Sequence, residues 1–403
     1  YLFRYKKRER QAATCRLQGR ILRWMYRRLG ATFVKLGQVL STRPDLLSAE
    51  SAAELRELQD ELPPFSFRYV KTNLEHTFNG ALEIHFSHFD AVPIAAASVA
   101  QVHRATLKDG TDVAVKVLRP NIRRVVERDG QIIRLLALII EWLSSSVRLS
   151  QPVAHAEHIL KSIVDQTDLS LELRNYERFR ANFSQQQHVI FPRVFPELSS
   201  TQVLTMTFCE GKKIDEVDPR HYPIVAPLIR EAFLKMCFED GFMHADMHPG
   251  NFVITAENKL AIYDVGLVCE IIDRTLEHFV DFAKCITIGT ADDLVRHIRT
   301  YHDYLDHVDW EAVTAESEAI VTRLRSAPIA ELEWSAFIAD ILSLTRRHRI
   351  RPLPELVMVM VGVVTAEGIG KQIDPDTNTF DDIAKFILPI LIKRNMLPVG
   401  GMP

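Results

Sequence analysis

The spacing of apolar residues divides this 403-residue chain into a helical beginning, a strand-rich middle and a longer helical remainder. Residues 1–80 favour helices: residues 49–62 have a helical repeat, and Pro63-Pro64 ends it because proline cannot continue a helix. Residues 113–118 (VAVKVL) are predicted to form a strand, since they are rich in β-branched side chains and follow a turn signal at Asp109-Gly110.

More strands are expected on either side of this one. Residues 89–105 are predicted as loop and strand, residues 203–208 as a strand, and residues 252–263 as a hairpin within a region that is otherwise helical beyond Gly211. A small β-rich lobe followed by a larger helical lobe is the layout of a protein-kinase fold, so the expected class is α+β. The expected domains are a helical extension at 1–80, an N-lobe at 81–208 and a C-lobe at 209–403.

Composition narrows the class of protein. With 47% hydrophobic and 25% charged residues, the chain is of ordinary globular composition and long enough for two cores. Its longest apolar stretch, residues 132–147, is interrupted by Arg134, Glu141 and three serines, so we expect a buried helix there rather than a membrane-spanning one. The sequence begins at Tyr1 rather than Met, so we expect further sequence upstream, where targeting signals would lie.

Cysteine usage indicates the redox environment. The five cysteines show neither paired nor metal-binding spacing, at Cys15, Cys209, Cys237, Cys269 and Cys285. This scatter favours reduced thiols in a cytosol-like compartment over a disulfide framework.

Positive charge is concentrated at the start of the chain. The net charge is −3, yet residues 1–30 hold ten lysines and arginines against the single acid Glu9, which leaves −12 for the remainder. Apolar residues recur there one helical turn apart, at Leu17, Ile21, Met25 and Leu29. A basic amphipathic helix of this kind lies either on an anionic membrane surface or against its own domain with solvated arginines. Nucleic acid is the weaker third option, because the rest of the chain is acidic and carries no recognition motif.

The segment 244–266 (HADMHPGNFVITAENKLAIYDVG) has the residues of a phosphoryl-transfer site in the right order. Asp246 precedes Asn251 by five residues, and Asp264 follows at the end of an apolar run. In protein kinases a catalytic-loop Asp accepts the substrate proton, while an Asn five residues on and the Asp of an Asp-Phe-Gly turn hold Mg²⁺. We therefore predict that Asp246 is catalytic and that Asn251 and Asp264 are metal ligands.

Lys116, inside the predicted strand, is the candidate for contact with the α- and β-phosphates. A lysine on a central strand presents its ammonium at one end of the sheet, whereas the alternative is a solvent-facing lysine. Its carboxylate partner is predicted to be Glu172, because Asp168, Glu172 and Asn175 share one helical face; the alternative is an ordinary exposed glutamate. We expect a partly exposed pair that orients phosphates and adds little to stability.

The loop that covers the phosphates should precede Lys116, where protein kinases have G-x-G-x-x-G. This chain has an alanine-rich segment instead, residues 93–103 (PIAAASVAQVH). Alanine adds methyl groups where glycine lets backbone N–H groups approach phosphates, so the nucleotide should be held differently. Tight packing is the other explanation for such small residues. The predicted nucleotide contacts in this loop are Ala95, Ala96, Ala97, Ser98 and Val99.

These features together resemble the UbiB/AarF family of atypical protein-kinase-like proteins, over roughly residues 30–374. Besides the alanine-rich loop, the resemblance rests on three motifs, which are residues 33–38 (FVKLGQ, with K-x-G-Q), 244–251 (HADMHPGN) and 264–266 (DVG). It implies a helical extension that packs over the active site, where Lys35 and Gln38 would act with Asp168. Protein substrates are not expected, because in the family that extension covers the place where a peptide would dock.

The resemblance also implies a function. It implies that ATP or ADP is bound with Mg²⁺, held by the Lys116–Glu172 pair, with adenine against the backbone near Met206 and Phe208. It implies ATPase or atypical kinase activity that supports isoprenoid-quinone (ubiquinone) biosynthesis. The expected partners are membrane lipids, quinone intermediates and other quinone-biosynthesis proteins. The expected location is peripheral, on the cytoplasmic face of a bacterial membrane or its organellar equivalent.

One position departs from the family pattern. The family has an E-x-D motif before the helix glutamate, and the matching residues here are Gln166-Thr167-Asp168. Because glutamine cannot form the ion pair that glutamate would, Lys35 is left with Asp168 as its expected carboxylate partner. The extension is therefore expected to be held more loosely.

Two further readings compete with an active enzyme. A nucleotide-gated scaffold without chemistry would tolerate loss of a site residue, yet Lys116, Glu172, Asp246, Asn251 and Asp264 are all present. An ordinary Ser/Thr kinase is disfavoured by the missing glycine loop, and no Ala-Pro-Glu motif follows the metal-binding Asp-Val-Gly.

Overall fold

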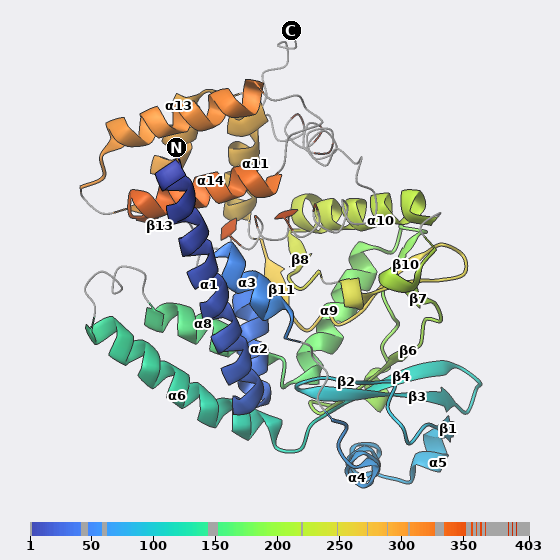
Figure 1. The fold of residues 1–403 in the computed structure, drawn as a ribbon. Coiled ribbons are helices and arrows are strands. Elements are labelled where there is room, and N and C mark those ends of the chain that lie inside the picture. The colour runs from blue at the N-terminus through green and yellow to red at the C-terminus, as the bar shows by residue number, and fades with distance from the viewer. Residues whose placement is uncertain are drawn as a thin grey trace. The chain divides into compact units, whose positions relative to one another are not determined.

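The computed structural model, drawn as a ribbon in Figure 1, consists of two compact units. Unit 1 consists of residues 1–185, 191–210 and 263–267, and unit 2 of the rest. The predicted boundary at 208/209 lies next to the division at 210/211. The described residues are 2–41, 47–58, 63–143, 152–218, 221–247, 249–271, 273–287, 289–304, 307–326, 334–351 and isolated positions beyond 351.

Unit 1 begins with three packed helices, α1 (Leu2–Leu29), α2 (Ala31–Ser41) and α3 (Ala49–Arg56). Val34, Leu55 and Leu58 form their small core, with Tyr26 against it. Gly37 of α2 lies where the helices cross, since a Cβ there would stand 2.3 Å from the Leu58 side chain. The predicted helix at 49–62 is confirmed over its first part, and residues 59–62 lie outside the described range.

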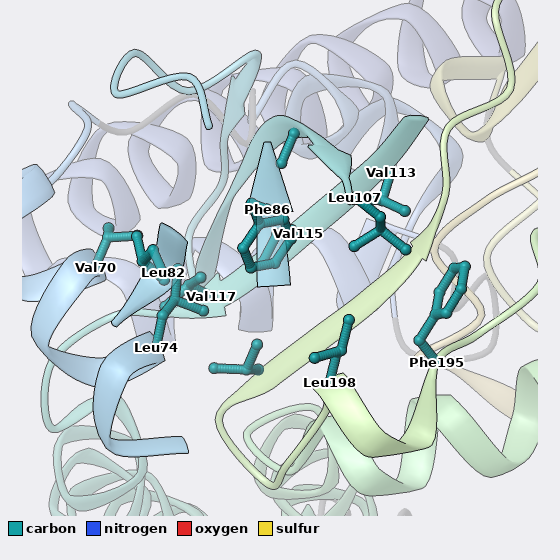
Figure 2. Close-up of a cluster of buried hydrophobic side chains, with 12 residues drawn as sticks. Val70, Leu74, Leu82, Phe86, Leu107, Val113, Val115, Val117, Phe195 and Leu198 are labelled. Atoms are coloured by element: carbon teal, nitrogen blue, oxygen red, sulfur yellow. The ribbon is translucent and has the colours of Figure 1, made fainter. Parts of the chain in front are cut away.

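The sheet of unit 1 is antiparallel, with the order β1-β3-β4-β6 and β2 paired to β3. The predicted strand at 113–118 is confirmed, and its Lys116 alternates with the buried Val115 and Val117. Those two valines face α4 and α5 in the core that Figure 2 shows. The elements are α4 (Phe67–Phe78), α5 (Leu82–His85), β1 (Phe86–Phe89), β2 (Ala95–Ala96), β3 (Ala100–Leu107), β4 (Asp112–Leu118) and β6 (Val203–Thr207).

The described residues of this unit also form the α-helices α6 (Ile122–Leu143), α8 (Pro152–Asp165) and α9 (Leu169–Asn182). The expectation of a buried helix at 132–147 is wrong for the described part, residues 132–143. One face of α6 packs on α8 through Val126 and Gly130, while apolar side chains around the rest of the helix stay exposed. The exposed apolar residues of α6 are Ile132, Leu135, Leu136, Leu138, Ile139, Ile140, Trp142 and Leu143.

Among the described residues, none of the helices combines the length and the apolar character that crossing a bilayer requires.

Unit 2 holds short strands and a set of helices. The predicted hairpin is confirmed as β9 paired with β10, and β5 and β7 extend this sheet. β8 pairs with β11; strands this short leave no periodicity in the sequence. The strands are β5 (Val189–Ile190), β7 (Lys212–Lys213), β8 (Phe242–His244), β9 (Phe252–Ile254), β10 (Leu260–Ile262), β11 (Val268–Glu270), β12 (Asp303–Tyr304) and β13 (Ile350–Arg351).

The helices of unit 2 pack in chain order, α11 on α12, α12 on α13 and α13 on α14. α10 passes into a π-helix over Lys235–Glu239, immediately before β8. Such bulges are frequent beside functional sites. The α-helices are α10 (Tyr222–Leu234), α11 (Asp273–Thr287), α12 (Ala291–Tyr301), α13 (Trp310–Ser326) and α14 (Trp334–Arg347).

Candidate functional site

A lysine held by two carboxylates is the centre of the site in unit 1. Lys116 Nζ lies 3.0 and 2.8 Å from the two carboxylate oxygens of Glu172 and 2.8 Å from Asp264 Oδ1. The structure thus brings together three residues that are far apart in the sequence, as their predicted roles require. Their burial differs: the side chain of Glu172 is 5% exposed and that of Asp264 is 41% exposed. Of the two carboxylates, Asp264 is the one open to solvent and to a metal ion.

Burial and charge shift the pKa values of this group in defined directions. Burial alone would lower the pKa of Lys116, but the Asp264 and Glu172 carboxylates outweigh it, so the pKa is raised and the lysine stays charged. Burial raises the pKa of Glu172; Lys116 opposes that shift, and the Asp264 charge adds to it. The pair is buried, so the expectation of a partly exposed pair is wrong, while its small effect on stability stays a prediction.

Helix α9 positions both Glu172 and the turn that carries Asp264. Glu172, Asn175 and Tyr176 occupy one face at i, i+3 and i+4. Asn175 donates from Nδ2 to the Val265 carbonyl over 2.8 Å, and Tyr176 Oη accepts from the Asp264 backbone N–H over 3.0 Å. One helical face therefore holds the lysine's partner and fixes the turn that carries the predicted metal ligand Asp264.

Asp264 has a left-handed backbone, with φ at +53°. Residues other than glycine rarely adopt this region, although aspartate and asparagine tolerate it best. Strain of this kind persists where the surroundings impose it. Here the bond that Asn175 donates to Val265 and the bond that Tyr176 accepts from the Asp264 N–H do so.

The second group of predicted residues lies in unit 2, in the loop between β8 and β9. Buried His244 accepts the Asp246 backbone N–H on Nδ1 over 3.0 Å. Asn251 donates from Nδ2 to the Asp246 carbonyl over 2.9 Å. The loop backbone is thus fixed by residues of the His-Ala-Asp and Asn positions, while His248 lies outside the described residues. Carboxylate and amide oxygens are the ligands that Mg²⁺ prefers, so Asn251 and Asp264 each carry a suitable ligand atom, and their shared metal ion stays a prediction.

The alanine-rich loop forms a tight hairpin at the edge of the unit 1 sheet. Ala95 and Ala96 pair with β3, and the Ala97 N–H donates to the Ala100 carbonyl over 2.8 Å. Ser98 and Val99 are buried. Ala95 is exposed and Ala96 and Ala97 are half-buried, so close packing applies to Ser98 and Val99, and the predicted phosphate contacts of the three alanines stay predictions.

Arg119 fixes this loop to the extension, a role that no sequence motif indicated. Its Nε donates to the Ala97 carbonyl over 2.9 Å, and both terminal nitrogens donate to the Pro63 carbonyl over 3.1 Å. Gln101 Oε1 accepts the Phe65 N–H over 2.9 Å, which holds the same segment against β3.

The residues of the K-x-G-Q motif are divided between two roles. Lys35 is buried and lies close enough to Glu172 for its charge to oppose, together with Lys116, the burial that raises the pKa of that glutamate. Gln38 donates from Nε2 to the Leu58 carbonyl over 3.2 Å and so holds the end of α3. The two residues therefore connect α2 to the lysine cluster and to α3.

Asp168 and Gln166 frame the start of α9. Asp168 caps that helix, because its Oδ1 accepts both the N–H and the hydroxyl of Ser170. Gln166 Nε2 donates to the Ser162 carbonyl over 3.2 Å, and its side chain lies beside Gly266. The predicted contact between Lys35 and Asp168 stays a prediction.

The segment predicted to meet adenine belongs to β6 and the residues that follow it. Met206 is buried and pairs with Ala114. The N–H groups of Thr207 and Phe208 donate to the carbonyls of Arg193 and Asp112. These backbone donors thus serve the sheet, and the adenine contact is a prediction that rests on the family resemblance.

Sequence reasoning missed Tyr176 and Arg119. Tyr176 could have been found, because it follows Glu172 by one helical turn on the face already singled out. Arg119 contacts Ala97 and Pro63 across 22 and 56 residues of sequence, and no local pattern indicates such contacts.

Comparisons with known proteins agree with this geometry. The model of the ABC1 atypical kinase-like domain matches residues 57–297, and that of the UbiB helical domain matches residues 317–378. The solved complex of Rv3197 with erythromycin from Mycobacterium tuberculosis has the same fold, with a TM-score of 0.59 over 77% of this chain and 80% of that chain at 19% identity.

Curated proteins similar to the chain carry the name "Probable protein kinase UbiB". The protein from Aliivibrio salmonicida is 28% identical over 386 residues, covering 93% of this chain and 71% of that protein. Its counterpart from Aeromonas hydrophila is 30% identical over 381 residues (92% and 70%), and that from Pseudomonas aeruginosa is 30% identical over 379 residues (92% and 71%).

Proposed function

The chain belongs to the UbiB family of ABC1 atypical kinase-like proteins, and we propose that it binds ATP or ADP with Mg²⁺ and catalyses phosphoryl transfer from ATP. The observation that carries this proposal is the buried Lys116 held between Glu172 and Asp264. In kinases the same lysine–glutamate pair and metal-binding aspartate must both be in place for transfer.

Each residue then has a defined task. Lys116, kept charged by its two carboxylates, would hold the α- and β-phosphates. Asp264 and Asn251 would supply oxygen ligands to Mg²⁺, which neutralises phosphate charge when bound. Asp246 would accept the proton of the attacking hydroxyl or water. The accepting molecule would be a water or a small lipid-pathway substrate rather than a protein, because in the family that this chain resembles the extension covers the place where a peptide would dock.

Substitution of the metal-binding aspartate tests this assignment. Asp264→Asn keeps a residue that tolerates the left-handed backbone and removes only the charge. It should abolish Mg²⁺-dependent stabilisation by ATP and ATP turnover, while apo stability changes little. Asp109→Asn, on the exposed turn before β4, is the matched control and should keep both. Unchanged Mg²⁺-ATP stabilisation in Asp264→Asn would rule out the metal-ligand role; stabilisation without turnover in the unaltered chain would favour the scaffold function.

We further propose that the protein acts at a membrane surface, in isoprenoid-quinone (ubiquinone) synthesis or a related lipid pathway. Two helices of unit 1 support this. α1 packs on α2 and α3 through Gly19, Leu22 and Tyr26, and it leaves an apolar stripe exposed. That stripe consists of Leu17, Ile21, Trp24, Met25 and Leu29.

The charge of α1 is shared between two uses. Arg20 and Arg23 pair with Glu54 of α3, so part of the basic charge serves the unit's own packing. Arg28 lies over the exposed Trp24 ring at 4.4 Å, where both can meet a lipid headgroup region. The exposed face of α6 adds a second and larger apolar surface. The two sequence-based readings of residues 1–30 are therefore compatible.

Single charges placed on each surface test membrane binding without removing a packed helix. Trp24→Glu and Leu136→Glu should each weaken co-sedimentation with anionic vesicles, and high salt should weaken it further. Ile84→Glu, an equally exposed apolar position on α5, should have no effect. If all three variants bind vesicles as well as the unaltered protein does, the membrane contact lies elsewhere. Lipid and quinone profiles of a strain lacking the protein, rescued by wild type or Asp264→Asn, would identify the pathway.

A further inference from the structure

Three donor side chains of different chemistry converge between α11 and α12 in unit 2. Asp281 and Cys285 lie one helical turn apart on α11, and His297 lies on α12. One oxygen, one sulfur and one nitrogen from these residues all lie within 4.8 Å of one another. Asp281 Oδ2 and His297 Nδ1 are 2.9 Å apart. No residue of the kinase-like motifs takes part in this cluster.

The turn between the two helices brings these donors together. Gly289 lies so close to Cys285 that a Cβ on it would stand 2.6 Å from the Cys285 Cα. α12 then begins with a capping box in which Thr290 and Asp293 satisfy each other's backbone N–H groups. Only glycine permits this approach, and the tight turn sets His297 opposite Asp281 and Cys285.

One buried polar atom of the cluster has no partner in the described part of the chain. His297 has a fully buried side chain, and its Nε2 has no hydrogen-bond partner among the described residues. An ordinary aspartate–histidine hydrogen bond explains Nδ1 but neither Nε2 nor the adjacent thiol. Buried polar atoms without partners are rare and often mark an ion or water. A hollow of about 320 Å³ lies beside the cluster, and all three donor residues line it.

We propose that Asp281, Cys285 and His297 bind one zinc ion whose fourth position opens into this hollow. Thiolate, imidazole and carboxylate together are the donors that zinc selects, whereas Mg²⁺ and Ca²⁺ take oxygen ligands. Zinc bonds of about 2.0–2.3 Å require donors roughly 3.3–3.8 Å apart in a tetrahedral site. This spacing falls between the 2.9 Å from Asp281 Oδ2 to His297 Nδ1 and the 4.8 Å within which all three donors lie. Three protein ligands leave one position for water or an anion, and Lys284 and Arg296 also line the hollow.

Binding has a chemical cost at the cysteine. Burial raises the pKa of the Cys285 thiol to about 12, so zinc has to displace its proton, which is released to solvent. The new bond is between zinc and sulfur, and no oxidant or reductant is needed. The bonds from zinc to the His297 nitrogen and the Asp281 oxygen offset the free-energy cost of deprotonating the thiol.

Metal binding by the full-length chain tests the proposal. The protein is stripped with a chelator and titrated with Zn²⁺ against a chromogenic competitor, with excess Mg²⁺ to fill oxygen-only sites. We expect about one tight zinc per chain. Cys285→Ser and His297→Gln should each weaken binding at least about tenfold. His278→Phe is the matched control, because it removes a buried imidazole of α11 that is outside the cluster, and it should bind normally.

Cobalt substitution provides a second reading that does not depend on the stability of any variant. Co²⁺ in the unaltered protein should give a near-ultraviolet charge-transfer band from the Cys285 thiolate and intense visible bands of a tetrahedral site. Absence of these bands, absence of tight zinc, or full retention of zinc by both Cys285→Ser and His297→Gln would overturn the assignment.

Discussion

Tyr176 accepts the backbone N–H of Asp264 on its phenol oxygen over 3.0 Å, across 88 residues of sequence. Tyr176 is completely buried, and burial raises its pKa well above the usual value, so the phenol stays neutral. A neutral hydroxyl is thus the partner that holds Asp264, the predicted metal ligand, in its left-handed conformation.

Tyr176→Phe should therefore impair the site more than the fold. The loss of one hydrogen bond with its buried N–H left unpaired costs about 1–3 kcal/mol. Part of that free energy is lost from the left-handed conformation of Asp264, which becomes less populated. The apparent Kd for Mg²⁺-ATP should therefore rise by about tenfold. Tyr263→Phe is the control, because Tyr263 bonds to Cys209 instead of to the turn. An unchanged Kd in Tyr176→Phe would show that other contacts suffice to hold Asp264.

Lys116→Met should destabilise the apo protein, because it leaves a buried carboxylate without its cation. An uncompensated buried charge costs up to about 3–5 kcal/mol, and Glu172 escapes it only by taking up a proton. The pKa of Glu172 is already raised by burial and rises further without Lys116. A raised carboxyl pKa contributes stability that is present at low pH and lost as pH rises through it, so the variant should be less impaired at pH 5 than at pH 8.

A second substitution separates charge from packing in that variant. Lys116→Met combined with Glu172→Gln removes both members of the pair and should recover much of the lost melting temperature, with the pH dependence gone. ATP turnover should stay abolished in both variants. A melting temperature for Lys116→Met equal to wild type at pH 8 would mean that the cluster is solvated and the pair contributes little.

Ala97→Gly should alter nucleotide preference. Glycine would let the loop backbone approach the phosphates, so the ratio of ATP to ADP affinity should change. Because the Ala97 carbonyl accepts from Arg119, the change should be larger when Arg119→Met is added. Affinities measured by calorimetry for the single and double variants decide this. If the ratio is the same in all of them, the loop serves packing alone.

Gln166→Glu should strengthen the attachment of α2. The new carboxylate would stand beside Gly266, near Glu172 and buried Lys35. With one more anion for Lys35, hydrogen exchange of residues 33–41 should slow relative to β4. Gln166→Met, which removes the bond to Ser162 without adding charge, is the control. Faster exchange of residues 33–41 in Gln166→Glu than in Gln166→Met would indicate repulsion among the carboxylates instead of stronger attachment of α2.

Local patterns predicted much of the unit 1 site. Helical spacing pointed to Glu172, and β-branched neighbours placed Lys116 on a strand, because both signals repeat over short stretches. Burial was harder to predict: the apolar run at 132–143 forms the expected helix, yet periodicity does not say whether another element covers it. Likewise, Cys285 showed no metal spacing along the sequence, since its neighbours Asp281 and His297 come from two helices brought together by the turn at Gly289.

Arg119 donates hydrogen bonds to two separate segments, and this has a thermodynamic consequence. One guanidinium holds the carbonyl of Ala97 in the alanine-rich loop and that of Pro63 in the extension. A ligand that displaces one segment must therefore alter the conformational free energy of the other. Such coupling between two sites is reciprocal. If nucleotide binding shifts the loop, it will change the affinity of the extension for any ligand that binds there. That ligand will then change the affinity for nucleotide by the same factor. Arg119 would set the size of that factor, and Arg119→Met would reduce it towards one.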